Sequence, residues 1–209
     1  MGSNPAPEQP SLPDLRDSQG LPGLQVRRAG PEDWETYRDL RITSLIDSPR
    51  AFWTTYATAA RWSEEEWRDR LGWPTWFAYA PLSPDPEQPP APVGLVSLWR
   101  APEMPEGDIV LIQMWVASWV RGRGVTDLLM RTAVEAARED GWDRVVLEVV
   151  EDNDRAMGAY RRLGFVPTGR TATMPWDESV TEVEMVLELA PETLDPPPGD
   201  AGGDEDCGG

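Results

Sequence analysis

The chain has 209 residues, with 37 acidic and 19 basic side chains, no histidine and one cysteine, and its formal net charge is −18. This composition excludes histidine-based catalytic triads and cysteine-cluster metal sites. A chain this acidic is also a poor non-specific ligand for nucleic acid, which is bound through basic side chains. We therefore expect no metal site and no nucleic-acid partner. The negative charge favours a cationic partner by long-range attraction, although an acidic surface also serves solubility alone.

Both ends of the chain have the composition of disordered tails. Residues 1–23 are rich in proline, serine and glutamine, and residues 191–209 carry six acids, no base and the single cysteine, Cys207. One folded domain is predicted over residues 24–190. No apolar run approaches the roughly 20 residues of a membrane span, and the first residues do not resemble a signal peptide. We expect a cytoplasmic monomer or homodimer with no membrane partner.

The domain is predicted to begin with a strand and two helices. A short strand covers residues 24–28. Pro31 is typical of the first turn of a helix, and apolar residues at helical spacing continue this helix until Pro49. Ser63 followed by Glu66 is a capping-box pattern, which predicts the start of a second helix.

The rest of the domain alternates between apolar strands and helices that end at glycine, a residue favoured just after the last helical turn. Strands are expected at residues 75–80, 93–99, 108–118, 143–150, 165–169 and 181–189, and helices at about 126–140 and 154–163. The resulting order is β-α-α-β-β-β-α-β-α-β-β. It predicts an α/β fold with a central mixed sheet flanked by helices on both faces.

A glycine-containing turn joins the most apolar strand to the next helix. Backbone N–H groups at the start of a helix have no partner within it, and glycine leaves space for an anion to reach them. The pattern therefore suits a pyrophosphate, although an ordinary helix start has the same residues. A Walker A loop would need a lysine, and a dinucleotide-binding turn would need a third glycine. The turn consists of Arg121, Gly122, Arg123, Gly124, Val125 and Thr126.

A second motif follows the next predicted strand. Asn153 precedes a helix on which Ala156, Tyr160 and Leu163 share one face. Taken singly, Asn153 has the character of a helix cap and Tyr160 that of a core aromatic residue. Their position downstream of the glycine turn favours a shared function instead.

In order and spacing, the two motifs resemble those of the GNAT superfamily of N-acetyltransferases. That family has an Arg/Gln-x-x-Gly-x-Gly/Ala loop, then a strand, then Asn-x-x-Ala-x-x-x-Tyr and a closing Gly-Phe. This chain departs from the pattern with a threonine at the last position of the loop. The matching residues are Arg121, Gly124, Thr126, Asn153, Ala156, Tyr160, Gly164 and Phe165.

The resemblance implies that acetyl-CoA is the co-substrate and that its acetyl group passes to a primary amine. Backbone N–H groups of residues 121–126 would bind the pyrophosphate of CoA. The backbone of Met114, Trp115 and Val116 would pair with the pantetheine arm where two parallel strands diverge. Asn153 would hydrogen-bond the cofactor.

Proton transfer is needed in such a reaction because a lysine-type amine has a pKa of about 10.4 and is largely protonated at neutral pH. The resemblance places Tyr160 near the sulfur of CoA, where it would act as general acid. Glu148 has the spacing of the base proposed for enzymes that acetylate the N-termini of ribosomal proteins. A solvated strand acid is the alternative interpretation of Glu148, and water relays to Glu103, Glu106 or Asp108 are other routes.

The acceptor is expected to lie against residues 48–67, with Trp53, Tyr56 and Trp62, and against residues 174–176. Aromatic rings beside acids can hold a cation, but the same rings can simply fill the core. We expect a small cationic molecule such as an amine antibiotic, or a peptide α-amine. A non-catalytic acetyl-CoA sensor and an interaction protein acting through its acidic tail are the alternatives.

Overall fold

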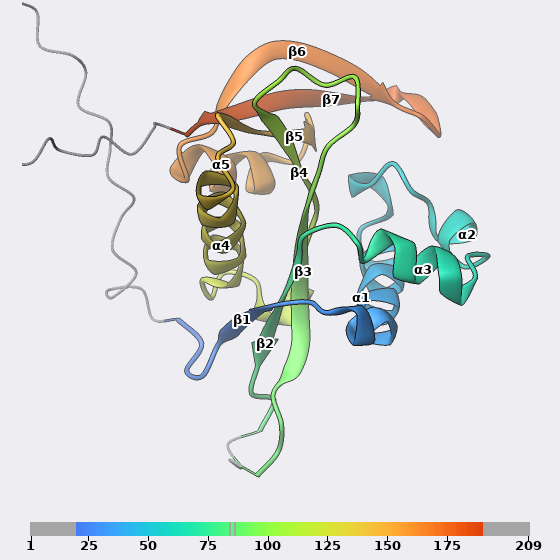
Figure 1. Ribbon diagram of the computed structural model, residues 1–209, viewed down its shortest axis with the longest axis vertical. Helices are drawn as coiled ribbons and strands as arrows, with labels where there is room; N and C mark the ends of the chain where they lie inside the picture. Colours follow the sequence, from blue (N-terminus) through green and yellow to red (C-terminus); the bar gives the residue numbers. More distant parts are fainter. Residues whose placement is uncertain (1–19, 84, 86, 190–209) are drawn as a thin grey trace, which may run out of the picture.

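The computed structural model describes residues 20–83, 85 and 87–189. The tail predicted at 191–209, with Cys207, and most of the tail predicted at 1–23 lie outside the described residues. The chain forms a seven-stranded sheet in the order β1-β2-β3-β4-β5-β7-β6 (Figure 1). The strands are β1 Gln25–Arg28, β2 Thr75–Ala80, β3 Ala91–Trp99, β4 Asp108–Val116, β5 Arg144–Val150, β6 Val166–Met174 and β7 Asp177–Glu188.

Helices cover both faces of the sheet, as predicted. One group, α1 to α3, lies on one face, and α4 and α5 lie on the other (Figure 1). The helices are α1 Trp34–Asp47, α2 Tyr56–Ala59, α3 Glu64–Arg70, α4 Val125–Glu139 and α5 Asp154–Arg162, with 3-10 turns η2 Pro31–Asp33, η3 Pro49–Ala51 and η4 Ser118–Val120. No helix in the described part is both long and apolar enough to cross a membrane.

Local sequence signals explain where the helices start and which faces they bury. At α3, the Ser63 hydroxyl accepts from Glu66 N–H at 3.3 Å and the Glu66 carboxylate accepts from Ser63 N–H at 2.7 Å, so the predicted capping box is confirmed. Helix α4 buries one stripe of its surface against the sheet. The buried residues of this stripe are Val125, Leu129, Met130, Ala133, Val134 and Ala137.

The parallel strands β4 and β5 stop pairing soon after they begin. Residues 108–110 pair with residues 144–146, and every other neighbouring pair of strands in the sheet is antiparallel. Beyond this short ladder, the facing edges of β4 and β5 carry no mutual pairing. A gap therefore opens between two neighbouring strands in the middle of the sheet.

A β-bulge in β4 accompanies the gap. A step of two residues on β3, from Leu95 to Ser97, is matched by a step of three on β4, from Trp115 to Ile112. Gln113 within this step has φ = 61°, the only positive φ of a non-glycine residue in the described part of the chain. The extra residue bends β4 and re-aims its side chains.

The predictions for the last strands and for the first helices were wrong in part. The strand predicted at 165–169 instead extends to Met174 and returns through Pro175 and Trp176 as the β6–β7 hairpin. The short helix α2 was not predicted. Residues 31–33 form a 3-10 turn, so the first α-helix begins at Trp34.

Candidate functional site

The glycine turn forms a row of free backbone donors at the start of α4. Gly122 and Gly124 have φ of 79° and 81°, a conformation that other residues adopt only with strain, and nothing lies within 4 Å of where their Cβ atoms would be. In the described part of the chain, residues 122–127 donate no backbone hydrogen bond, and donation resumes at Leu128, whose N–H bonds to the Gly124 carbonyl at 3.0 Å. Such a row suits a phosphate group.

The side chain of Arg121 is held by the protein itself. Its Nε donates to the Val116 carbonyl at 2.7 Å, and its guanidinium also donates to the Asp47 carboxylate, which accepts from Trp115 Nε1 at 3.0 Å. Burial acts to raise the pKa of Asp47, but hydrogen bonds from Trp115, Ser48 and Arg121, in decreasing order of effect, lower it below its ordinary value. Arg121 thus ties the turn to the end of α1, while Arg123 is exposed and keeps its charge available.

The turn lies at the end of the strand edge that borders the gap. Met114 is half-buried, and Trp115 and Val116 are 6% and 5% exposed. These residues belong to the part of β4 that has no pairing with β5. An extended ligand running from the gap to the glycine turn would meet strand backbone that has no partner on β5, of which the Val116 carbonyl accepts from Arg121 Nε, and then the free N–H groups.

Asn153 performs the capping role foreseen for it. Its Oδ1 accepts from the Ala156 N–H at 3.2 Å at the start of α5. The side-chain nitrogen of Asn153 donates to no group in the described residues. One end of the amide therefore fixes the helix, and the other end remains available to a ligand.

Tyr160 lies in the core on the α5 side of β5, with Leu147 and Val149 in the same buried cluster. Its side chain is 8% exposed, and burial raises the pKa of its phenol to about 12. Its ring lies 6.1 Å from that of Phe165, and its hydroxyl makes no hydrogen bond to the described residues. Tyr160 is therefore a neutral phenol whose proton is free to be donated.

Glu148 lies on β5 just beyond the residues that pair with β4, and it points to the face opposite Leu147 and Val149. Its cross-strand partner on β7 is another acid, Glu184, and Glu182 lies two residues away. Desolvation of the carboxyl, followed by the charges of Glu182 and Glu184, raises the pKa of Glu148 to about 7. A carboxyl with this pKa exchanges protons near neutral pH.

The loop after α1 reaches across to the β6–β7 hairpin. Trp53 Nε1 donates to the carboxylate of Glu182, which is 3% exposed, and Trp176 Nε1 donates to the Phe52 carbonyl at 2.9 Å. Burial raises the pKa of Glu182 despite the hydrogen bond from Trp53. The two segments expected to contact the acceptor, one in residues 48–67 and the other at 174–176, thus meet over the acids of β5 and β7.

The sequence that forms this fold matches the model of one acetyltransferase family. The Acetyltransferase (GNAT) family model matches residues 41–165, which is more than half of the chain. The chain belongs to this family. The sequence-based resemblance and the mixed α/β fold are therefore confirmed.

Curated relatives of the GNAT domain include N-acetyltransferase 8F1 of Rattus norvegicus and streptothricin acetyltransferase of Streptomyces lavendulae. The first is 37% identical over 87 residues, covering 40% of this chain and 39% of the relative. The second is 46% identical over 75 residues, covering 36% of this chain and 39% of the relative. The chain thus spans about two-fifths of the length of these relatives.

Among solved structures, YncA of Salmonella typhimurium, determined with its cofactor acetyl-CoA, superposes with a TM-score of 0.64. The two chains are 17% identical, and the match covers 86% of this chain and 99% of that one. At this identity the likeness shows a shared fold.

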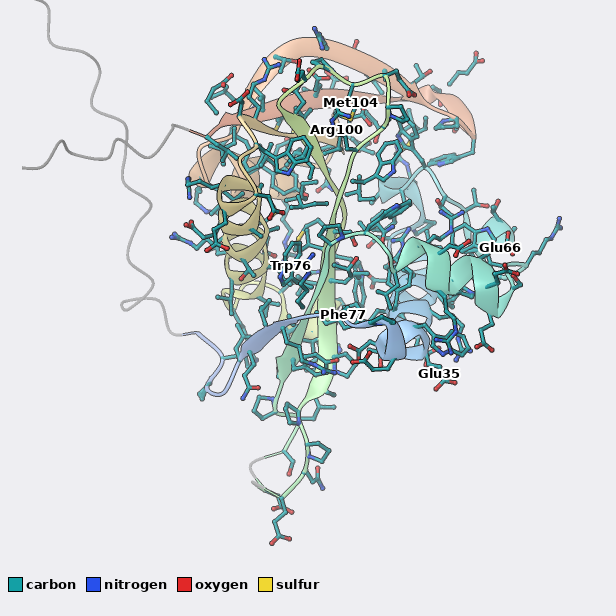
Figure 2. The ribbon with its side chains drawn as sticks, in the orientation of Figure 1. Glu35, Glu66, Trp76, Phe77, Arg100 and Met104 are labelled. Carbon is teal, nitrogen blue, oxygen red and sulfur yellow. The ribbon has the colours of Figure 1, made fainter. Side chains whose placement is uncertain are left out.

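Other acids named as possible bases lie away from the gap of this GNAT domain. Asp108 is 5% exposed and accepts from Arg144 Nε at 2.6 Å within the paired part of β4 and β5. Glu103 and Glu106 are on the loop between β3 and β4. The labels of Arg100 and Met104 mark this loop in Figure 2. Glu148 is therefore the better placed of these acids.

Trp62 and Tyr56, which were also expected at the acceptor site, have other surroundings. Trp62 packs edge-to-face on Trp67, with ring centroids 4.7 Å apart, and belongs to the packing of the helices. Tyr56 is 49% exposed at the start of α2. Of the three aromatic residues expected to face the acceptor, only Trp53 contacts the acids of β7.

A polar cluster under α1 was not predicted from the sequence. The Tyr37 hydroxyl donates to Gln113 Oε1 at 3.0 Å, beside the bulge of β4, and Arg41 lies one helical turn further along α1. A signal was present, because Arg41 is four residues from both Tyr37 and Leu45 and so falls on the apolar face of the helix. Arginine on such a face indicates either a buried ion pair or a ligand.

Proposed function

We propose that this protein transfers the acetyl group of acetyl-CoA to a primary amine. The observation that carries the proposal is the strand gap that ends at a row of free N–H groups. Those N–H groups, at residues 122–127, suit the pyrophosphate of CoA, and the unpaired edge of β4 at Met114 to Val116 suits an extended arm with amide groups. The free amide nitrogen of Asn153 adds one further donor.

The proposed acid and base belong to opposite faces of the sheet, with Tyr160 in the core on the α5 side and Glu148 on the other face of β5. Bound acetyl-CoA would supply a thioester that an uncharged amine can attack. Glu148, with its pKa of about 7, would accept the proton that the amine must lose. Tyr160, a neutral phenol at this pH, would donate a proton to the departing sulfur. The neighbouring acids Glu182 and Glu184 would attract a protonated amine to this place.

Release of free thiol from acetyl-CoA tests the proposal. Purified protein would be assayed against polyamines, aminoglycosides, nucleoside amines, amino acids and short peptides, with a sample lacking acetyl-CoA to subtract the thiol of Cys207. Release that depends on one amine, and that falls in Glu148→Gln and Tyr160→Phe, supports acetyl transfer and identifies the acceptor class. Tight binding of acetyl-CoA without thiol release from any amine would favour the sensor instead.

A further inference from the structure

Arg41 is a buried cation without an acidic partner in the part of the chain that the structure describes. Its side chain is 3% exposed. It donates to the Ser44 hydroxyl at 2.9 Å, and its guanidinium lies 4.7 Å from the centroid of the Phe52 ring. None of the ion pairs in the described residues includes it.

Burial of an unpaired charge is costly. Removing a cation from water destabilises the folded protein unless an anion or several hydrogen bonds replace the water. Burial lowers the pKa of Arg41 to about 10, so the group remains protonated at neutral pH. Tyr37 offers no compensating charge, because burial raises the pKa of its phenol.

A second arginine adds to the positive charge. Arg70 on α3 has a buried Nε with no hydrogen-bond partner, and its guanidinium stacks 3.6 Å from the centroid of Trp62. Both Arg41 and Arg70 act electrostatically on Tyr37. Arg70 interacts electrostatically with the carboxylate of Glu66, which lies on the outer side of α3 (Figure 2).

The cluster borders the region where the acceptor would lie. Tyr37 connects it to Gln113 at the bulge of β4. Phe52 connects it to the loop whose next residue, Trp53, binds Glu182. The cations under α1 and the acids of β5 and β7 are therefore on the same face of the sheet, with residues 52 and 53 between them.

We infer that the acceptor is a zwitterion, with an amine that faces Glu148 and a carboxylate that pairs with Arg41. The inference rests on the proposed function and names its substrate class. A carboxylate and a guanidinium form two parallel charge-assisted hydrogen bonds, which would replace the water that Arg41 has lost.

The experiment compares δ-aminovalerate with δ-aminovaleramide, in which the amine and the carboxylate or amide are at opposite ends of a flexible chain, so that the loss of the carboxylate hardly changes the basicity of the amine. Thiol release gives kcat and KM, and tryptophan fluorescence in the presence of CoA gives binding. The wild-type protein should prefer the amino acid by about tenfold or more in kcat/KM. In Arg41→Gln, the KM of the amino acid should rise until the preference is lost, and the KM of the amide should stay within about twofold. Arg68→Gln, an exposed arginine on α3, is the control and should keep the preference.

Several results would overturn the inference. These are an equal or better kcat/KM for the amide in the wild-type protein, or turnover confined to amines without a carboxylate. Either leaves acetyl transfer itself intact. Conversely, Arg41-dependent binding of δ-aminovalerate without thiol release from any amine would support the anion site while removing the proposed function. The wild-type comparison decides the question even if Arg41→Gln fails to fold.

Discussion

Replacing Glu148 with glutamine removes the group whose ionisation should control acetyl transfer near neutral pH. With a pKa of about 7, the carboxyl is about half ionised at pH 7, about one-tenth ionised at pH 6 and about nine-tenths ionised at pH 8. Because only the ionised form accepts a proton, kcat/KM should fall about tenfold from pH 8 to pH 6 through this group alone. A glutamate of ordinary pKa would stay more than about 95% ionised over the same range.

The assay is thiol release from about pH 6 to about pH 9, with the wild-type rate divided by that of Glu148→Gln at each pH. The division is needed because the acceptor amine also loses its proton as the pH rises. The ratio should increase about tenfold between pH 6 and pH 8 and then level off, with kcat of the variant lower by about a hundredfold at pH 8. A ratio that does not vary with pH would refute Glu148 as the base.

A second variant tests how the charge of a neighbouring strand changes the pKa of the proposed base, Glu148. Glu184 faces Glu148 across the strand pair. At a charge separation of about 6 Å and an effective dielectric constant of about 40 to 80, its removal should lower the pKa of Glu148 by about half a unit to one unit. Glu184→Gln should therefore move the acidic limb to lower pH by that amount. Glu188→Gln, further along β7 and opposite Arg144, should leave the limb in place.

Three further substitutions test the cofactor side. Tyr160→Phe should lower kcat about a hundredfold and leave stability and calorimetric acetyl-CoA binding unchanged, since its hydroxyl has no hydrogen-bond partner among the described residues; weaker binding would assign it to holding the cofactor. Gly124→Ala places a side chain at φ = 81°, which should cost about 1–2 kcal/mol in thermal unfolding and raise the KM for acetyl-CoA. Wild-type values for both would show that the positive φ is not required. Asp47→Asn removes the carboxylate that binds Trp115 and Arg121 and should cost about 1–2 kcal/mol in urea unfolding, with a larger rise in KM for acetyl-CoA than for the amine. A change in stability below about 0.3 kcal/mol would argue that this contact contributes little.

The helices and strands that carry the glycine turn and the Asn153 motif were predictable because neighbouring residues in the sequence determine them. Helix α4, expected at about 126–140, spans Val125–Glu139, and β5, expected at 143–150, spans Arg144–Val150. Their apolar residues repeat at the helical spacing or form a continuous buried run, and glycine marks the helix ends. Such signals act within a few residues of the chain and do not depend on distant partners.

The acceptor side was harder to predict because its features arise from tertiary contacts. Residues 166–173 of β6 are all exposed, so no alternation of apolar and polar residues marked the strand beyond residue 169. The bulge at Gln113 depends on how β4 registers with β3. Likewise, the raised pKa of Glu148 depends on desolvation in the folded sheet and on the pairing of β5 with β7, which brings Glu182 and Glu184 beside it.

The glycine turn also determines which mutations the cofactor site would tolerate. Main-chain N–H groups are present whatever the side chain, so a contact built from them does not require particular side chains. Arg123 is exposed and Thr126 is half-buried, so both positions should accept many residues. Gly122 and Gly124 are constrained by their backbone angles, and Val125 by its burial in the core. Sequence drift across this turn should therefore be uneven, with variable positions directly beside positions that scarcely change.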